Sequence, residues 1–235
     1  MNEHTHKQFD AEMEAIRSGV LSMGGLVERQ LSRAIGVLGD VENNNAVIEV
    51  GSVEQQINQM QMTIDQQCSQ IIAKRQPAAI DLRMILTITK IVNDLERVGD
   101  EVKKIAYKAA QTRGSDRLTE VRHFEIARTA EHAQEMLQMA LDAFARLDPA
   151  AAAEVIDRDE KVDAAFLAVL RQLISYMMED PRTISSALEI VFIAKAIERI
   201  GDHAKNIAEA VVQVVMGKDV RHATAEQIRA EVAEE

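Results

Sequence analysis

The sequence predicts an all-α protein made of two tandem, homologous three-helix bundles, with six long helices in all. Composition supports this fold class, because the 235 residues include three Pro, ten Gly, no Trp and 3% aromatic residues, while 47% are hydrophobic. The abundant Ala, Leu, Met, Glu, Gln and Arg lose little side-chain freedom in a helix. A repeat supports the duplication, because residues 95–106 and 197–208 are identical at seven of twelve positions in a fixed register. Such a repeat indicates two copies of one structural unit.

The first half of the chain carries three segments in which apolar residues have helical spacing, over residues 9–38, 47–72 and 80–110. Gly39 and Pro77 lie in the two interruptions between these segments, where they break a helical pattern. Segments of about 30 residues form rods about 45 Å long at 1.5 Å per residue. Since short loops join them, we expect an up-down-up bundle.

The second half repeats this arrangement, with helices expected over residues 118–147, 150–178 and 182–216. Asp148 and Asp180 each precede a proline. In both places the Asp can cap free backbone N–H groups, while Pro occupies the first helical position. The Gly-Ser-Asp run at 114–116 is the clearest boundary between the halves. The expected divisions are a first bundle at 1–113, a second at 114–217, and a weakly ordered tail at 218–235.

The third and sixth helices show the clearest packing pattern, in which apolar and small residues alternate in steps of three and four. The residues of this seam are Ile85, Ile88, Val92, Leu95, Gly99, Val102, Ala106 and Ala109 in the third helix and Ile190, Ala194, Ile197, Gly201, Ala204, Ala208 and Val211 in the sixth. A glycine in a helix interior costs about 1 kcal/mol relative to alanine. The repeated Gly99 and Gly201 therefore indicate either a close backbone approach or room for a ligand.

Charge and hydropathy exclude several classes of protein. A formal net charge of −11 disfavours nucleic acid as a partner. The absence of an apolar run of about 20 residues argues against a membrane span. The polar first six residues do not resemble a signal peptide, so we expect a cytoplasmic protein. Cys68 is the only cysteine, and its place on an apolar seam predicts a small buried side chain.

Function is expected on two acidic pairs that the repeat conserves, Glu96 with Asp100 and Glu198 with Asp202. Each pair has i, i+4 spacing and lies beside the apolar seam. Like charges at this spacing destabilise a helix by about 0.2–0.5 kcal/mol unless a positive group lies between them. Oxygen-only ligands favour hard cations such as Mg, Mn, Ca or ferric iron. The pairs therefore predict metal sites.

Other interpretations of these residues stay open. An acidic pair is ordinarily a solvated helix face, paired here with Arg97 or Lys103. Asp94 and His203 are weaker candidate ligands, because the repeat places Ala196 and Glu101 at the corresponding positions. His4 and His6 could chelate a metal only adventitiously.

Motifs of catalysis are scarce, and we predict that the protein is not an enzyme. Carboxylate-bridged di-iron bundles need two facing Glu-x-x-His pairs, whereas Glu120 and His123 spell this pattern once. No Gly-rich phosphate loop and no His/Cys zinc cluster are present in the sequence.

With these residues in view, the chain resembles the PhoU family of bacterial phosphate-transport regulators over nearly its whole length. The segments that carry the resemblance are residues 23–28 (MGGLVE), 71–77 (IIAKRQP), 81–83 (DLR), 96–100 (ERVGD), 177–180 (MMED) and 198–202 (ERIGD). The family's E/D-x-x-x-D signature falls on Glu96 with Asp100 and on Glu198 with Asp202. The resemblance implies two tandem three-helix bundles, often a homodimer, with metal ions on the acidic stripes where metal is bound; Fe, Mn, Mg or Zn are the candidate ions.

The resemblance also implies an adaptor that restrains phosphate uptake and the phosphate-starvation response. Its partners would be the ATPase subunit of a Pst-type ABC phosphate transporter and a PhoR-type sensor histidine kinase, with contact to the membrane only through them. A metal-loaded bundle that serves as an ion store or oxidoreductase, and a metal-free structural scaffold, are the alternatives.

Four residues are candidates for contact with a partner: Asp81, Arg83, Arg97 and Arg199. For Asp81 and Arg83, which follow Pro77, the alternative is a structural role that begins the third helix with a cap and a charge pair.

Overall fold

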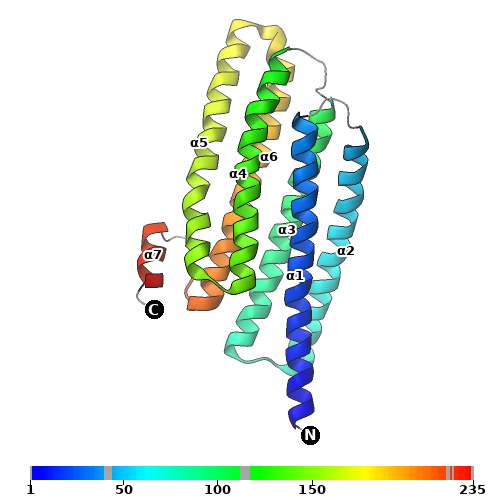
Figure 1. Cartoon of the computed structure of the whole chain (residues 1–235), viewed down its shortest axis with the longest axis vertical. Helices are drawn as coiled ribbons and strands as arrows, with labels where there is room; N and C mark the ends of the chain where they lie inside the picture. The colour runs from blue at the N-terminus through cyan, green and yellow to red at the C-terminus, as the bar shows by residue number, and fades with distance from the viewer. Residues whose placement is uncertain (1, 40–43, 112–116, 221–222, 224, 234–235) are drawn as a thin grey trace.

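The helices run along the length of a flat molecule, with α3 and α6 at its centre and α2 and α5 on its outer sides (Figure 1). This computed structural model describes residues 2–39, 44–111, 117–220, 223 and 225–233. The elements are α1 Asn2–Gly39, α2 Asn44–Arg75, α3 Ala79–Gln111, α4 Arg117–Arg146, α5 Pro149–Glu179, the 3-10 turn Pro181–Thr183, α6 Ile184–Met216 and α7 Ala225–Ala233. The described part of the chain is thus helical with no strand, and the predicted all-α class is confirmed.

Two sets of three helices pack side by side. Helices α1, α2 and α3 contact one another, as do α4, α5 and α6. The two sets meet where α3 packs on α6 and α1 packs on α4. Contacts pair the start of α3 with the end of α6, as in Arg83 with Val214, and the end of α3 with the start of α6, as in Lys108 with Glu189. These two central helices are therefore antiparallel.

One continuous core runs through both sets. It extends from Ile16 in α1 to Ile228 in α7 and contains the seams predicted for α3 and α6. Each fully buried Ile or Leu contributes about 1.5–3 kcal/mol of transfer free energy. Among the described residues, no helix has a stretch long and apolar enough to cross a lipid bilayer.

The ends of α5 and α6 test the predicted caps. Asp148 is the N-cap of α5, where its side chain accepts hydrogen bonds from the backbone N–H groups of Ala150 and Ala151, both at 3.0 Å. Asp180 was expected to start the last helix directly. It instead caps the 3-10 turn, through a 3.0 Å bond from the Arg182 N–H, and α6 begins only at Ile184.

The tail was expected to be weakly ordered, and this prediction was wrong for its described part. Residues 225–233 form α7, which packs on α5. Ile228 and Val220 are buried, and Arg229 pairs with Asp157 of α5 at 2.9 Å. The few apolar residues of a nine-residue helix give too weak a periodic signal to predict this docking.

The contact between α1 and α4 depends on Gly24. A Cβ atom placed on Gly24 would lie 2.7 and 2.8 Å from the two δ-carbons of Leu141, which is buried. Nearby, the Arg17 guanidinium donates to the Ala145 carbonyl of α4 at 3.4 Å. The two helices can therefore approach this closely only because position 24 has no side chain.

We predict that Gly24→Ala destabilises the protein by about 1–3 kcal/mol, because the added methyl group overpacks the α1–α4 contact. Gly36→Ala is the matched control, since α1 also contains Gly36 and no atom lies within 4 Å of its added Cβ. That change should stabilise the fold by about 0.5–1 kcal/mol through helix propensity. Chemical denaturation of both variants measures the difference, and equal free energies of unfolding would contradict the role given to Gly24.

Candidate functional site

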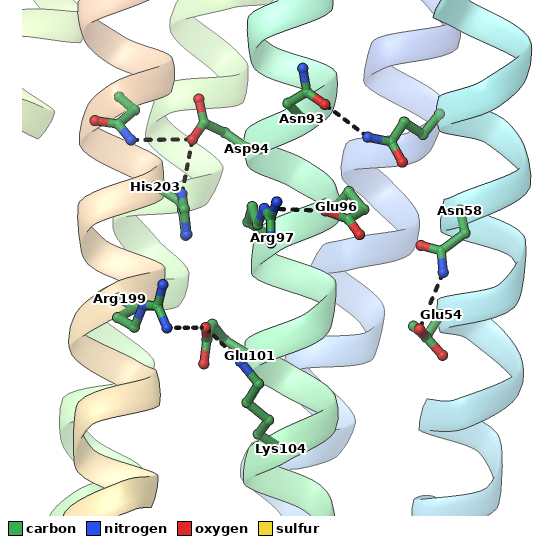
Figure 2. A network of polar contacts seen from close by, with 12 residues as sticks. Glu54, Asn58, Asn93, Asp94, Glu96, Arg97, Glu101, Lys104, Arg199 and His203 are labelled. Carbon is green, nitrogen blue, oxygen red and sulfur yellow. Dashed lines mark hydrogen bonds and ion pairs between the residues drawn. The ribbon is translucent and has the colours of Figure 1, made fainter.

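The conserved acidic pair of the first half faces α2. Glu96 of α3 points toward the α2 residues Glu54 and Asn58 (Figure 2). The Asn58 amide donates to Glu54 Oε1 at 3.2 Å, and Lys103 Nζ lies 2.9 Å from Glu54 Oε2. Asn58 Oδ1 is buried and has no hydrogen-bond partner. This site thus combines an amide oxygen with carboxylates from two helices.

The second half builds a more acidic site between α5 and α6. Oxygens of Asp159, Asp163 and Asp202 all lie within 4.8 Å of one another, and Glu198 is one turn from Asp202. Asp159 is buried, with 3% of its surface exposed. Lys205 Nζ lies 2.8 Å from Asp159 Oδ2, and Lys195 pairs with Glu198 Oε1. Three aspartate carboxylates from two helices therefore converge around a small volume, and the charge of Glu198 acts on Asp163 and Asp202 from close by.

Crowding perturbs the ionisation of both sites. Burial, and then the neighbouring charge of Glu198, raises the pKa of Asp202. Burial and the charge of Asp159 do the same to the pKa of Asp163. The pKa of Glu96 is raised by burial and by Asp100.

A raised pKa in the folded state makes ionisation of these carboxyl groups costly to the fold. The cost is absent below their ordinary pKa and appears as pH rises through the folded-state value, because there the folded state binds more protons than the unfolded state. A cation in either site would offset it at neutral pH.

Burial lowers the pKa of Lys205, but the hydrogen bond and charge of Asp159 outweigh this effect and hold the pKa above its ordinary value. Lys205 is therefore a charged partner of the site at neutral pH.

Both repeated glycines serve a close helix approach. A Cβ atom on Gly99 would lie 3.3 Å from Ile57 Cδ1 of α2 and 3.4 Å from Gln30 Oε1 of α1. On Gly201 it would lie 3.4 Å from Val162 Cγ1 and 3.5 Å from Asp159 Oδ1 of α5. Of the two roles that the sequence left open for these glycines, the close backbone approach is the one observed. It brings α3 close to α2, which carries Glu54, and α6 close to α5, which carries Asp159 and Asp163.

The sequence analysis did not predict the α2 and α5 contributions. Asp159 and Asp163 have the same i, i+4 spacing as the predicted pairs, and Glu54 and Asn58 occupy the corresponding positions of the first half. The duplicated spacing is therefore a signal that could have found them. It is weaker than the α3 and α6 signal because Asn58 replaces an acid in one copy.

Asp94 and His203 lie at the interface between α3 and α6, where they bind each other (Figure 2). Asp94 Oδ1 is 2.8 Å from His203 Nδ1 and accepts a 3.2 Å hydrogen bond from Asn206. Neither residue belongs to the group of three aspartates. The structure thus places these two weaker candidates in a bridge between the repeats.

A second bridge crosses the interface between α3 and α6 at Glu101, whose side chain is only 5% exposed. It pairs with Arg199 of α6 at 3.0 Å and with Lys104 at 2.9 Å (Figure 2). Glu101 and His203 are corresponding positions of the two repeats. Each bridge therefore includes one of these two positions, at which the repeats differ.

The four candidate partner contacts have different surroundings. Arg97 is exposed and lies 3.6 Å from Glu96, whereas Arg199 is engaged by Glu101. Asp81 lies inside the first turn of α3, which begins at Ala79, so it is not the N-cap. Its negative charge interacts favourably with the positive end of the helix dipole.

For Arg83, the alternative to a partner contact was a charge pair at the start of α3, but the structure places its guanidinium at the end of α6. It donates a long 3.5 Å hydrogen bond to the Val214 carbonyl. The same guanidinium covers Gly217, whose left-handed φ of 73° ends α6. A cation beside the last carbonyls of a helix is favourable.

Two further expectations concern single residues. Cys68 is buried as predicted, and burial raises the pKa of its thiol to about 11, so it is not a reactive thiolate at neutral pH. The side chains of His4, His6, Glu120 and His123, and the predicted boundary at 113/114, lie outside the described part of the structure.

We predict that Arg199→Ala lowers stability by about 1–3 kcal/mol, because Glu101 would stay buried with one partner fewer. Arg97→Ala is the matched control at the corresponding position of the other repeat. It should change the free energy of unfolding by less than about 0.5 kcal/mol, since its ion pair is exposed. If both variants unfold at the same denaturant concentration, the bridge does not join the halves energetically.

Together, the fold and the two sites define a tandem-repeat helical protein with a carboxylate cluster in each repeat. A family model described as "PhoU domain" matches residues 20–109 and 126–211. The chain therefore belongs to the PhoU family.

Sequence similarity to known proteins covers nearly the full length of the chain. It is 46% identical to the phosphate-specific transport system accessory protein PhoU homolog of Pseudomonas aeruginosa, covering 99% of this chain and 95% of that protein. It is 41% identical to the phosphate-specific transport system accessory protein PhoU of Escherichia coli strain K12, covering 97% and 93%.

Two crystal structures have the same fold. PhoU from P. aeruginosa superposes with a TM-score of 0.83 at 46% identity, covering 89% of this chain and all of that one. The phosphate transport system regulatory protein PhoU from Streptococcus pneumoniae gives a TM-score of 0.82 at 26% identity, covering 90% and 99%.

Proposed function

We propose that this protein regulates phosphate transport as an adaptor, and that it restrains phosphate uptake and the phosphate-starvation response. The full-length similarity to proteins named as phosphate-transport accessory proteins carries this proposal. Its finer part is a link between the ATPase subunit of an ABC phosphate transporter and a PhoR-type sensor histidine kinase in the cytoplasm. No catalytic step is needed for this role.

The shape of the molecule suits an adaptor. Long helices that share one core and are joined by bridges across α3 and α6 form a stiff body with broad lateral faces (Figure 1). A stiff body that binds one conformational state of each partner more tightly biases the equilibrium of both partners. Coupling of transporter and kinase then requires only differential affinity.

The carboxylate clusters fit a hard metal ion. All donors are oxygens, and Asp159 Oδ1 and Glu198 Oε2 are buried without a hydrogen-bond partner. Asp159, Asp163, Glu198 and Asp202 would hold an ion in the second half, and Glu54, Asn58, Glu96 and Asp100 in the first. Such oxygen sets favour Mg, Mn or ferric iron over Zn. When bound, the ion would supply positive charge that cross-links α5 to α6 and α2 to α3.

Deletion of the gene should make the phosphate-starvation response constitutive, because restraint of the sensor kinase would be lost. A starvation-promoter reporter in phosphate-rich and phosphate-poor medium measures this, with the deletion complemented by the wild-type gene as control. A response that still follows phosphate in the deletion strain would overturn the adaptor role.

The role of the acidic stripes is tested separately with the Glu96, Asp100, Glu198 and Asp202→Ala variant. Protein purified without an affinity tag should lose its bound metal, measured by elemental analysis, and should capture less transporter ATPase and sensor kinase in pull-downs. The control removes four exposed carboxylates elsewhere, through Asp10→Asn with Glu131→Gln, Glu160→Gln and Glu179→Gln. Equal metal content and equal capture would mean that the stripes are solvated surface, as in the metal-free scaffold.

A further inference from the structure

Two carboxylates of the second-half site share an unusual state, in which one oxygen is held by a lysine and the other has no partner. Lys205 binds Asp159 Oδ2, and Asp159 Oδ1 is buried and unsatisfied. Lys195 binds Glu198 Oε1, and Glu198 Oε2 is buried and unsatisfied. A buried charged oxygen without a partner is costly to a fold. Its occurrence twice in one site indicates that these two oxygens are kept free for a ligand.

The lysines also restrict how each carboxylate can rotate. Lys195 is restrained in turn by the Phe166 ring, whose centroid lies 5.3 Å from Nζ, and Lys205 is partly buried. Hydrogen bonds to the non-ligating atoms of metal ligands orient those ligands and raise affinity. Each lysine is therefore placed to present one carboxylate oxygen to an ion and to leave the second oxygen outside its coordination.

Charge balance agrees with a divalent ion. Lys205 is paired with Asp159 and Lys195 with Glu198, so the charges of Asp163 and Asp202 are left without a lysine partner. One divalent cation neutralises them without displacing either lysine. The lysines and the ion are then complementary charges of one site.

The first half lacks this arrangement. Both oxygens of Glu54, which corresponds to Asp159, are engaged, Oε1 by Asn58 and Oε2 by Lys103. Asn58 also replaces the fourth carboxylate. The first-half site consequently has less negative charge, and the buried oxygen without a partner that it offers is the neutral amide Oδ1 of Asn58, not a carboxylate oxygen.

We propose that Lys195 and Lys205 are positioning residues of a divalent metal site formed by Asp159, Asp163, Glu198 and Asp202, and that this is the tighter of the two sites in the chain. The inference rests on the metal binding proposed above, but assigns a separate role to the lysines. In the opposite role, the lysines would be cations that occupy the site and that a metal ion must displace. Removal of a lysine weakens metal binding if the lysine positions a ligand, and strengthens metal binding if the lysine competes with the ion.

The test titrates Mn²⁺ into full-length, untagged protein from which metal has been stripped with a chelator, with free Mn²⁺ followed by EPR and binding heat by calorimetry. Lys195→Met and Lys205→Met should each weaken the tight site 10–100-fold, the range typical of lost outer-shell partners. Lys205→Arg should restore part of the affinity. Removal of a positive charge by itself favours cation binding, so weaker binding is the result specific to a positioning role.

Two controls isolate the effect. Lys161→Met makes the same charge change on α5, at the groove that α5 forms with α4, and should leave Mn²⁺ affinity unchanged. Lys103→Met should alter only the weaker, first-half site. Thermal unfolding of each metal-free variant confirms that it is folded.

Unchanged or tighter Mn²⁺ binding in both lysine variants would overturn the positioning role and leave the metal site itself intact. A wild-type protein that binds no Mn²⁺ would overturn both. Loss of affinity in Lys161→Met to the same extent would show a general charge effect and would also overturn the inference.

Discussion

The antiparallel packing of α3 on α6 is the constraint on which the rest of the structure depends. These two helices carry the duplicated segment, and in or next to it Asp94 contacts His203 and Glu101 contacts Arg199. Buried residues of both helices belong to the one continuous core, and further polar contacts, such as Lys108 with Glu189, lie along the same interface. A shift of one helix along the other would separate the buried Glu101 carboxylate from Arg199 and Asp94 from His203, which is unfavourable. The register of the two halves is therefore set by both packing and charge.

Each copy of the duplicated segment has two working faces. One face contacts the other half. The second face carries acidic residues toward the outer helix of its own half, as Glu96 does toward α2 (Figure 2) and Asp202 toward Asp159 and Asp163 of α5. Gly99 and Gly201 lie between these faces and let the outer helix approach closely. Because the approach brings like charges together out of water, the pKa values of Glu96, Asp163 and Asp202 rise. The fold thus maintains electrostatic strain that a cation would relieve.

The two repeats diverge most informatively where they meet. Position 101 is Glu in one copy and His at position 203 in the other, and position 94 is Asp where the other copy has Ala196. From the sequence, this divergence argued against a shared function. In the structure, two of these divergent residues, Asp94 and His203, pair with each other across the interface between α3 and α6, and a third, Glu101, pairs there with Arg199.

The sequence by itself determined the six long helices, the N-cap at Asp148, the buried seams, the burial of Cys68 and the duplicated acidic pairs, because each depends on local spacing or on a dipeptide. Only the tertiary structure decided which helices supply the other carboxylates, that Arg83 covers the end of α6, and that α7 docks on α5. These features join residues far apart in the chain, such as Asp159 with Lys205 and Arg83 with Val214. Helical periodicity specifies which face of a helix is buried, but not which neighbour buries it or at what register, since those depend on the packing of all the helices together.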